Sequence, residues 1–125
     1  MPLSSARTAD LVAALLCVNN YPVDRAVALT PAFQAAGLLN PATVNAMPQD
    51  ALVATLVKAG YNRGGFVPIL AFRLYMLMEA LESGALDSLE DAVRAGDKGR
   101  FLATLGPLHG YGPKTVDLAW MLCTS

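Results

Sequence analysis

Apolar residues recur every three to four positions along most of this chain, which is the spacing of one face of an α-helix. Alternating runs of Val, Ile and Thr, which would indicate strands, do not occur in the sequence. Because 54% of the 125 residues are hydrophobic, a chain of this length can bury a substantial core. The sequence therefore predicts an all-α, compact multi-helix fold in a single domain, residues 1–125.

Prolines and glycines divide the apolar pattern into short helices. Thr8 is the expected N-cap of the first helix, which ends before Asn19. Proline begins or restarts a helix at five places, and glycine ends or interrupts one at four. The prolines are Pro22, Pro31, Pro41, Pro48 and Pro113, and the glycines are Gly37, Gly60, Gly84 and Gly96.

The segment 66–82 is apolar on nearly every side, which is typical of a helix surrounded by other helices. Pro68, Arg73 and Glu79 interrupt its most apolar part, which is shorter than the roughly 20 residues needed to span a bilayer. We therefore expect a buried central helix and no membrane segment.

Composition bears on cofactors, compartment and partners. Cys17 and Cys123 are far apart and the chain has one histidine, too few ligands for a zinc or iron–sulfur site, so no metal or other cofactor is expected. Two sparse thiols and an N-terminus without a signal-peptide pattern indicate a cytoplasmic protein. The net charge of −1 gives no global attraction to polyanions, so any contact with DNA must be local.

Residues 101–123 carry the most specific motif, a predicted helix–hairpin–helix. Gly110 and Gly112 flank Tyr111 directly before a proline, a spacing that makes a tight turn between two helices. The glycines let a phosphate oxygen approach main-chain N–H groups at the positive end of the last helix, where Lys114 adds a charge. Tyr111 is expected to turn inward against Leu105, Leu108, Val116 and Leu118. The alternative is a glycine that ends one helix before an unrelated helix begins.

Residues 108–115 (Leu-His-Gly-Tyr-Gly-Pro-Lys-Thr) resemble the hairpin of the endonuclease III-like base-excision DNA glycosylases, where Leu-Pro-Gly-hydrophobic-Gly-x-Lys-Thr-Ala is usual. Residues 15–20 (Leu-Leu-Cys-Val-Asn-Asn) look like the family's Leu-Leu-x-x-Gln/Asn segment. Residues 52–63, ending Ala-Gly-Tyr-Asn-Arg, are similar to its Ile-x-x-x-Gly-Tyr-Asn-x-Lys stretch. The resemblance spans nearly the whole chain and implies the family's six-helix barrel domain, which carries the hairpin.

The sequence also departs from the family pattern. The family's catalytic aspartate follows at a place beyond Ser125, and the second helical domain and the cysteine cluster of many members are absent from the sequence. His109 stands where proline is usual, and Val116 where alanine is usual. The barrel face that the second domain would cover is expected to expose apolar surface, which a homodimer or a partner chain would bury.

The resemblance implies double-stranded DNA, damaged or intact, as the partner, and it implies a set of DNA-contacting residues. These are Leu108, His109, Gly110, Tyr111, Gly112, Lys114, Thr115 and Asn19. In members with lyase activity the lysine attacks the sugar C1′ as a Schiff-base nucleophile, which requires a neutral amine. Lys114 is therefore either a catalytic nucleophile or a phosphate contact. Asn19 either fills the gap left by a flipped base or forms a helix-ending turn.

Other polar residues near these motifs receive structural interpretations. Asp117, one helical turn from Lys114, is interpreted as a first-turn carboxylate that suits the helix dipole rather than as a substitute acid. His109 is given no chemical role beyond its place in the hairpin, and residues 61–63 either belong to the family motif or only end one helix and cap the next. Three functions follow: a minimal glycosylase or abasic-site lyase, a non-catalytic DNA-binding module, and a protein-interaction module.

Overall fold

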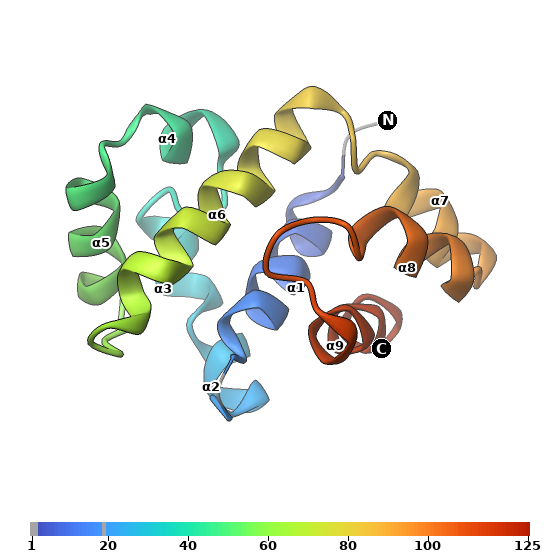
Figure 1. Ribbon diagram of the computed structural model, residues 1–125, viewed down its shortest axis with the longest axis horizontal. Coiled ribbons are helices and arrows are strands. Elements are labelled where there is room, and N and C mark those ends of the chain that lie inside the picture. Colours follow the sequence, from blue (N-terminus) through green and yellow to red (C-terminus); the bar gives the residue numbers. More distant parts are fainter. Residues whose placement is uncertain (1–2, 19) are drawn as a thin grey trace.

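The structure is a computed structural model in which residues 3–18 and 20–125 are described (Figure 1). The described residues form nine helices and no strands, so the all-α prediction is confirmed. The helices are α1 (Ser5–Leu16), α2 (Val23–Ala28), α3 (Thr30–Ala35), α4 (Pro41–Ala46), α5 (Gln49–Lys58), α6 (Phe66–Ser83), α7 (Ser88–Ala95), α8 (Lys98–Leu105) and α9 (Pro113–Thr124).

Most helices begin and end where proline and glycine predict. Asn40 caps α4, because its side-chain oxygen accepts hydrogen bonds from the main-chain N–H groups of Ala42 and Thr43. α3 and α5 end shortly before Gly37 and Gly60. Proline, glycine and a capping asparagine therefore set the helix boundaries in the first half of the chain.

The predicted start of the first helix is wrong. Ser4 is the N-cap of α1, and its hydroxyl oxygen accepts a hydrogen bond from the N–H of Arg7. Thr8 lies inside the helix, where its own hydroxyl donates to the carbonyl oxygen of Ser4. Several residues of N-capping type precede the apolar run, and the start at Ser4 rather than Thr8 lengthens the helix by four residues, slightly more than one turn.

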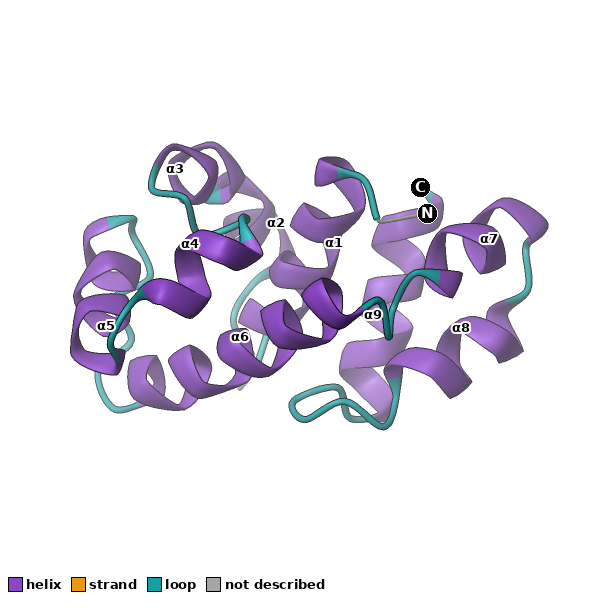
Figure 2. Ribbon diagram, turned by 90° about the horizontal axis from the view of Figure 1, so that it is seen from above, coloured by secondary structure: helices purple, strands orange, loops and turns teal. Residues whose placement is uncertain are grey.

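α1 lies in the middle of the molecule and packs against α2, α6 and α9 (Figures 1 and 2). Its residues 11–16 are all buried. α6 crosses the molecule in front of α1 in the view of Figure 1 and packs against α4 and α5. α7 packs on α8, and α8 on α9, so the last three helices form a flank of their own beside α1.

α6 is buried on one side only. Residues such as Val67, Leu70 and Leu74 face the core, while Phe66, Ile69 and Phe72 are 37%, 47% and 49% exposed. The prediction of a helix enclosed on every side is therefore wrong, because none of the helices in the described part of the chain covers this side. We call Phe66, Ile69 and Phe72 the α6 stripe. No helix among the described residues is both long and apolar enough to cross a membrane.

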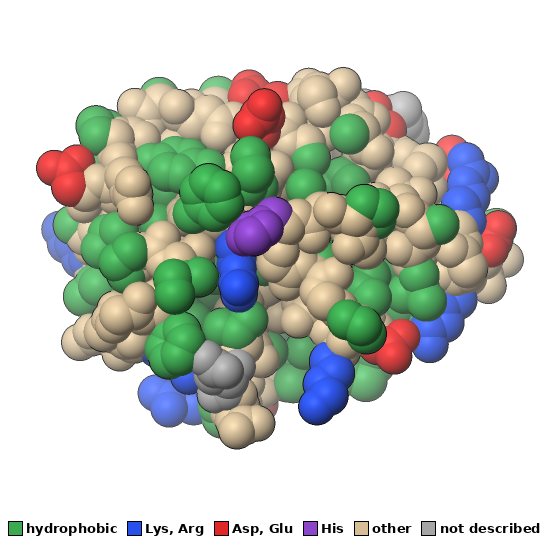
Figure 3. Space-filling model, in the orientation of Figure 1, with side chains coloured by type: hydrophobic (Ala, Val, Ile, Leu, Met, Phe, Trp, Pro, Cys, Tyr) green, Lys and Arg blue, Asp and Glu red, His purple; other side chains and the backbone are tan. Residues whose placement is uncertain are grey.

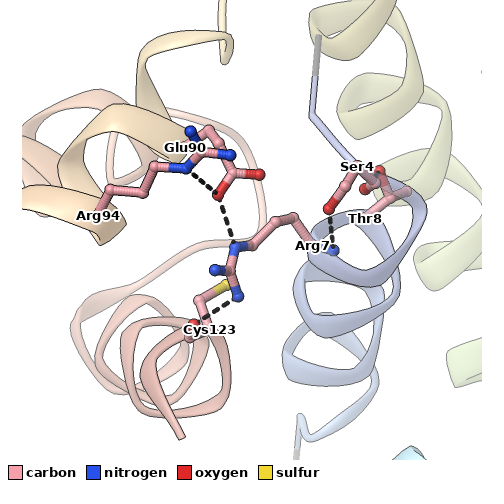
Figure 4. Close-up of polar contacts among 6 residues, drawn as sticks. All are labelled: Ser4, Arg7, Thr8, Glu90, Arg94 and Cys123. Carbon is pink, nitrogen blue, oxygen red and sulfur yellow. Dashed lines mark hydrogen bonds and ion pairs between the residues drawn. The ribbon is translucent and has the colours of Figure 1, made fainter.

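A polar network joins α1, α7 and the end of α9 (Figure 4). The Nε of Arg7 lies 3.0 Å from Oε2 of Glu90, and its Nη1 donates to the carbonyl oxygen of Cys123 at 2.6 Å. Glu90 is only 8% exposed, and Arg94 lies 3.9 Å from the same carboxylate oxygen. The network holds the C-terminal turn of α9 against the first helix. The hairpin lies at the other, N-terminal end of α9.

Candidate nucleic-acid interface

The hairpin joins α8 to α9 through residues 106–112, and it is anchored to the first helix. The ring of Tyr111 turns inward as predicted and is 2% exposed. Its hydroxyl donates a hydrogen bond to the carbonyl oxygen of Leu11 at 2.7 Å. Burial raises the pKa of this hydroxyl well above its ordinary value. Tyr111 therefore fastens the turn to α1.

The two hairpin glycines serve different purposes. Gly110 has a φ of +97°, and a Cβ added there would lie 2.9 Å from both the Cδ1 of Leu15 and the Cδ of Arg73. Folding alone thus requires a glycine at this position. Gly112 has a φ of −69° and is exposed, and a Cβ there would meet nothing within 4 Å. Folding does not require a glycine at Gly112.

Gly112 is also the N-cap of α9, and it offers no side chain to cap the helix. The first hydrogen bond of α9 runs from the N–H of Val116 to the carbonyl oxygen of Gly112. Among the described residues, no group accepts from the N–H groups of Lys114 and Thr115. These two donors stand at the positive end of a twelve-residue helix, which is a favourable place for an anion.

A cleft of about 520 Å³ lies beside this helix end. It separates the loop after α1, the first half of α6 and the first turn of α9. Its lining residues are Cys17, Val18, Asn20, Phe66, Ile69, Arg73, Lys114 and Thr115. The fold thus brings the 15–20 segment and the hairpin segment, both singled out in the sequence, to one cleft. Asn20, at its edge, is the one non-glycine residue with positive φ in the described part of the chain, at 65°.

The cleft is basic although the chain carries a net charge of −1. Arg73 and Lys114 both line it, the lining holds no carboxylate, and neither residue forms an ion pair with a described residue. The Nε of Arg73 is buried and has no hydrogen-bond partner among the described residues. Sequence reasoning did not identify Arg73, because it treated this residue only as an interruption of an apolar helix.

Arg63 supports the rim of the cleft. Its Nη1 donates to the carbonyl oxygen of Val18 at 2.6 Å and lies 3.5 Å from the hydroxyl of Tyr61, which is fully buried. Its guanidinium also lies over the rings of Tyr21 and Phe66, at 5.0 and 5.1 Å from their centroids. In this structure Tyr61 and Arg63 hold the loop after α1 in place, a role beyond the capping of two helices.

The remaining predicted residues are placed as follows. Asn19 lies outside the described residues. His109 is exposed, and its ring meets the ring of Phe72 edge-on with centroids 5.2 Å apart. Leu108 and Thr115 are half-buried. Asp117 lies 3.2 Å from Lys98 and forms no ion pair with Lys114, so the structure gives it no part in the cleft.

Figure 3 shows this face of the molecule, with apolar side chains gathered over α6, basic side chains near them and acidic side chains mostly toward the edges. In the part of the chain that the structure describes, no three His, Cys, Asp or Glu side chains gather where they could hold a metal ion. Comparisons of the chain with models of known protein families, with curated proteins and with solved structures gave no match.

Proposed function

We propose that this chain binds DNA through the sugar–phosphate backbone and that the hairpin makes the contact. The main observation in support of this proposal is the glycine at position 112. A Ser, Asn or Asp would cap α9 as well as or better than glycine, and nothing in the fold excludes a side chain there. A glycine at this exposed place leaves room for a phosphate oxygen to reach the N–H groups of Lys114 and Thr115.

The charges around the cleft support the same proposal. Lys114 stands on the first turn of α9, and Arg73 lies in the same cleft lining, which contains no carboxylate. Phosphate contacts of this kind position a protein on DNA without reading its sequence. Since the net charge is −1, binding rests on these few local cations, and a shallow dependence of affinity on salt is expected.

Two substitutions at Gly112 test the proposal directly. Asp and Asn are equally good N-caps, so Gly112→Asp and Gly112→Asn are both expected to keep or slightly raise the melting temperature. The aspartate places a negative charge where the phosphate would lie. Either cap takes up the N–H groups of Lys114 and Thr115 that a phosphate would use, so fluorescence anisotropy with a labelled duplex should show weaker binding in both variants, and weaker in Gly112→Asp than in Gly112→Asn. Wild-type affinity in both variants would contradict the proposal.

Lys114→Ala provides a second test, with Lys58→Ala as its matched control. Lys58 is an exposed lysine in the last turn of α5, which lies at the left edge of the molecule in Figure 1, away from the hairpin near the middle of the view. Loss of one phosphate contact should reduce the slope of log affinity against log salt by about 1. We expect this change for Lys114→Ala and none for Lys58→Ala. Similar slopes for both variants would argue against contact at the hairpin.

Abasic-site cleavage is a second candidate function, favoured by the position of Lys114 in a cleft whose opposite side is apolar. Its amine would attack the C1′ aldehyde of an abasic sugar and, with loss of water, form an imine. A water molecule would then take the C2′ proton as the 3′-phosphate leaves, which breaks the strand, and hydrolysis of the remaining imine would release the enzyme. Borohydride reduces the imine to a stable amine, so it would leave a covalent protein–DNA adduct.

An abasic duplex mixed with the protein and borohydride separates these two functions. An adduct that forms with the wild type and disappears in Lys114→Ala and Lys114→Arg identifies a lyase. Binding of the same duplex without an adduct identifies a non-catalytic DNA-binding module.

A further inference from the structure

We propose that the α6 stripe binds the bases of an unpaired DNA strand whose backbone is held at the hairpin. The inference rests on the proposed DNA binding and adds the class of substrate: DNA with an unpaired segment rather than continuous duplex. Three observations carry it, namely the exposure of the stripe, its continuity with the hairpin, and the charges beside it.

The stripe exposes two aromatic rings to a ligand, and the guanidinium of Arg63 covers one face of the Phe66 ring at 5.1 Å from its centroid. Phe66 and Phe72 are 37% and 49% exposed and lie on one side of α6, with Ile69, which is 47% exposed, between them. Phe66 and Phe72 are six positions apart, so their Cα atoms are about 9 Å apart along the helix axis. This length is enough for two bases at a stacking separation of about 3.4 Å.

The stripe is continuous with the hairpin and the cleft. At one end Phe72 meets the ring of His109 in the hairpin turn. At the other end Phe66 and Ile69 line the cleft together with Arg73 and Lys114. Aromatic side chains beside cations that follow a backbone are the combination that binds single-stranded nucleic acids, because each base stacks on a ring and each phosphate meets a charge.

These charges also argue against a second copy of the chain as the occupant of the stripe. In a two-fold dimer the same surface faces itself, so the cations of one copy approach those of the other. Arg73 and Lys114 have no ion-pair partner among the described residues, and the cleft lining supplies no carboxylate to neutralise them. Like charges brought together in this way oppose association, whereas a phosphate strand neutralises them.

Only unpaired bases can use this surface. In a duplex the faces of the bases are covered by their neighbours, and exposing one costs unstacking and unpairing. In an overhang, a gap or a single strand the bases are already unpaired, so binding to the stripe requires no unpairing. The structure therefore predicts tighter binding to DNA that contains unpaired bases, with the hairpin contributing to the binding of every probe.

The experiment compares a blunt duplex, the same duplex with a ten-nucleotide thymine overhang, and a thymine single strand, using fluorescence anisotropy at one salt concentration. The wild type should bind the two probes with unpaired bases more tightly than the blunt duplex. Phe72→Ala and Phe72→Leu should each lose about five- to tenfold in affinity for those two probes and little for the duplex. Phe72→Trp should restore the preference, because it restores an aromatic face.

Met121→Ala is the matched control. Met121 is 53% exposed and lies two turns beyond Lys114 along α9, so its loss removes exposed apolar surface without touching the stripe. Its affinities should equal those of the wild type. Because Phe72 is half exposed, its variants should stay folded, and thermal unfolding followed by circular dichroism verifies this for each protein.

The outcomes separate this inference from the function on which it rests. If Gly112→Asp weakens binding to every probe while the Phe72 variants change nothing, the hairpin binds DNA and the stripe proposal is wrong. Equal wild-type affinity for blunt and overhanging duplexes overturns it as well. Sedimentation that shows a dimer dispersed by Phe72→Ala assigns the stripe to self-association instead. Absence of binding to all three probes refutes the proposed function itself.

Discussion

Replacement of Gly110 by alanine should destabilise the whole domain, although the residue lies in a surface turn. Its φ of +97° costs an alanine about 1–2 kcal/mol. The new Cβ would also lie 2.9 Å from the Cδ1 of Leu15, a fully buried core residue, and 2.9 Å from the Cδ of Arg73. Overpacking of this kind costs about 1–3 kcal/mol, and the stem of Arg73 can move more easily than Leu15. We therefore expect Gly110→Ala to lower the free energy of unfolding by about 3 kcal/mol.

Thermal and urea unfolding followed by circular dichroism measure this effect, with Gly112→Ala as the control. For a domain of this size, 3 kcal/mol corresponds to a melting temperature lower by about 10 °C. Gly112→Ala introduces the same methyl group two residues away, at ordinary φ and in open space, so its free energy of unfolding should change by less than about 0.5 kcal/mol. Equal melting temperatures for the two variants would refute the packing role of Gly110.

Three further predictions concern the anchoring of the hairpin helices. Glu90→Gln should lower the free energy of unfolding by about 1–2 kcal/mol, measured by urea titration. This is less than the usual loss for a buried ion pair, because the Arg7 side chain is 26% exposed. An unchanged urea midpoint would contradict this prediction. Tyr111→Phe should cost about 1 kcal/mol through loss of the hydrogen bond to Leu11, and a gain in stability would show that this bond is not favourable. Burial raises the pKa of Cys123 from 9.0 to about 12, with carboxylates nearby adding to the rise. The unfolded chain therefore loses this proton first, and stability should fall as pH rises from 9 to 12, less steeply in Cys123→Ala; identical slopes would exclude the thiol as a cause.

Helix boundaries could be predicted because proline and glycine act within a few residues. Asn40 followed by a proline favours the start of a helix through local geometry alone, and the structure places α4 there. The misplaced first N-cap shows the limit of such rules. Ser4 and Thr8 are both good capping residues, and the earlier start places Arg7 within α1, where it contacts Glu90 and the carbonyl oxygen of Cys123 far along the chain.

The candidate interface could be predicted only in part. The hairpin residues follow one another in sequence, so their pattern is visible without a structure. The position of Arg73 beside the same cleft as Lys114 is not visible in the sequence, because it depends on α6 and α9 meeting across that cleft. The pattern also assigned both hairpin glycines to phosphate approach, whereas Gly110 is required by packing against Leu15. The contact of Arg7 with Glu90 joins residues 83 positions apart, which no local rule can anticipate.

The anchor between Tyr111 and Leu11 has a consequence for how the interface forms. The two residues are 100 positions apart, and α9 packs against α1 along its length. A loop of that size must close before the turn acquires its shape, and such long-range closure is late and slow compared with helix formation. The first helix leaves the ribosome well before the hairpin that completes its packing. A pulse-labelled chain should therefore become helical before it becomes competent to bind DNA, and the delay between the two would report the time of that closure.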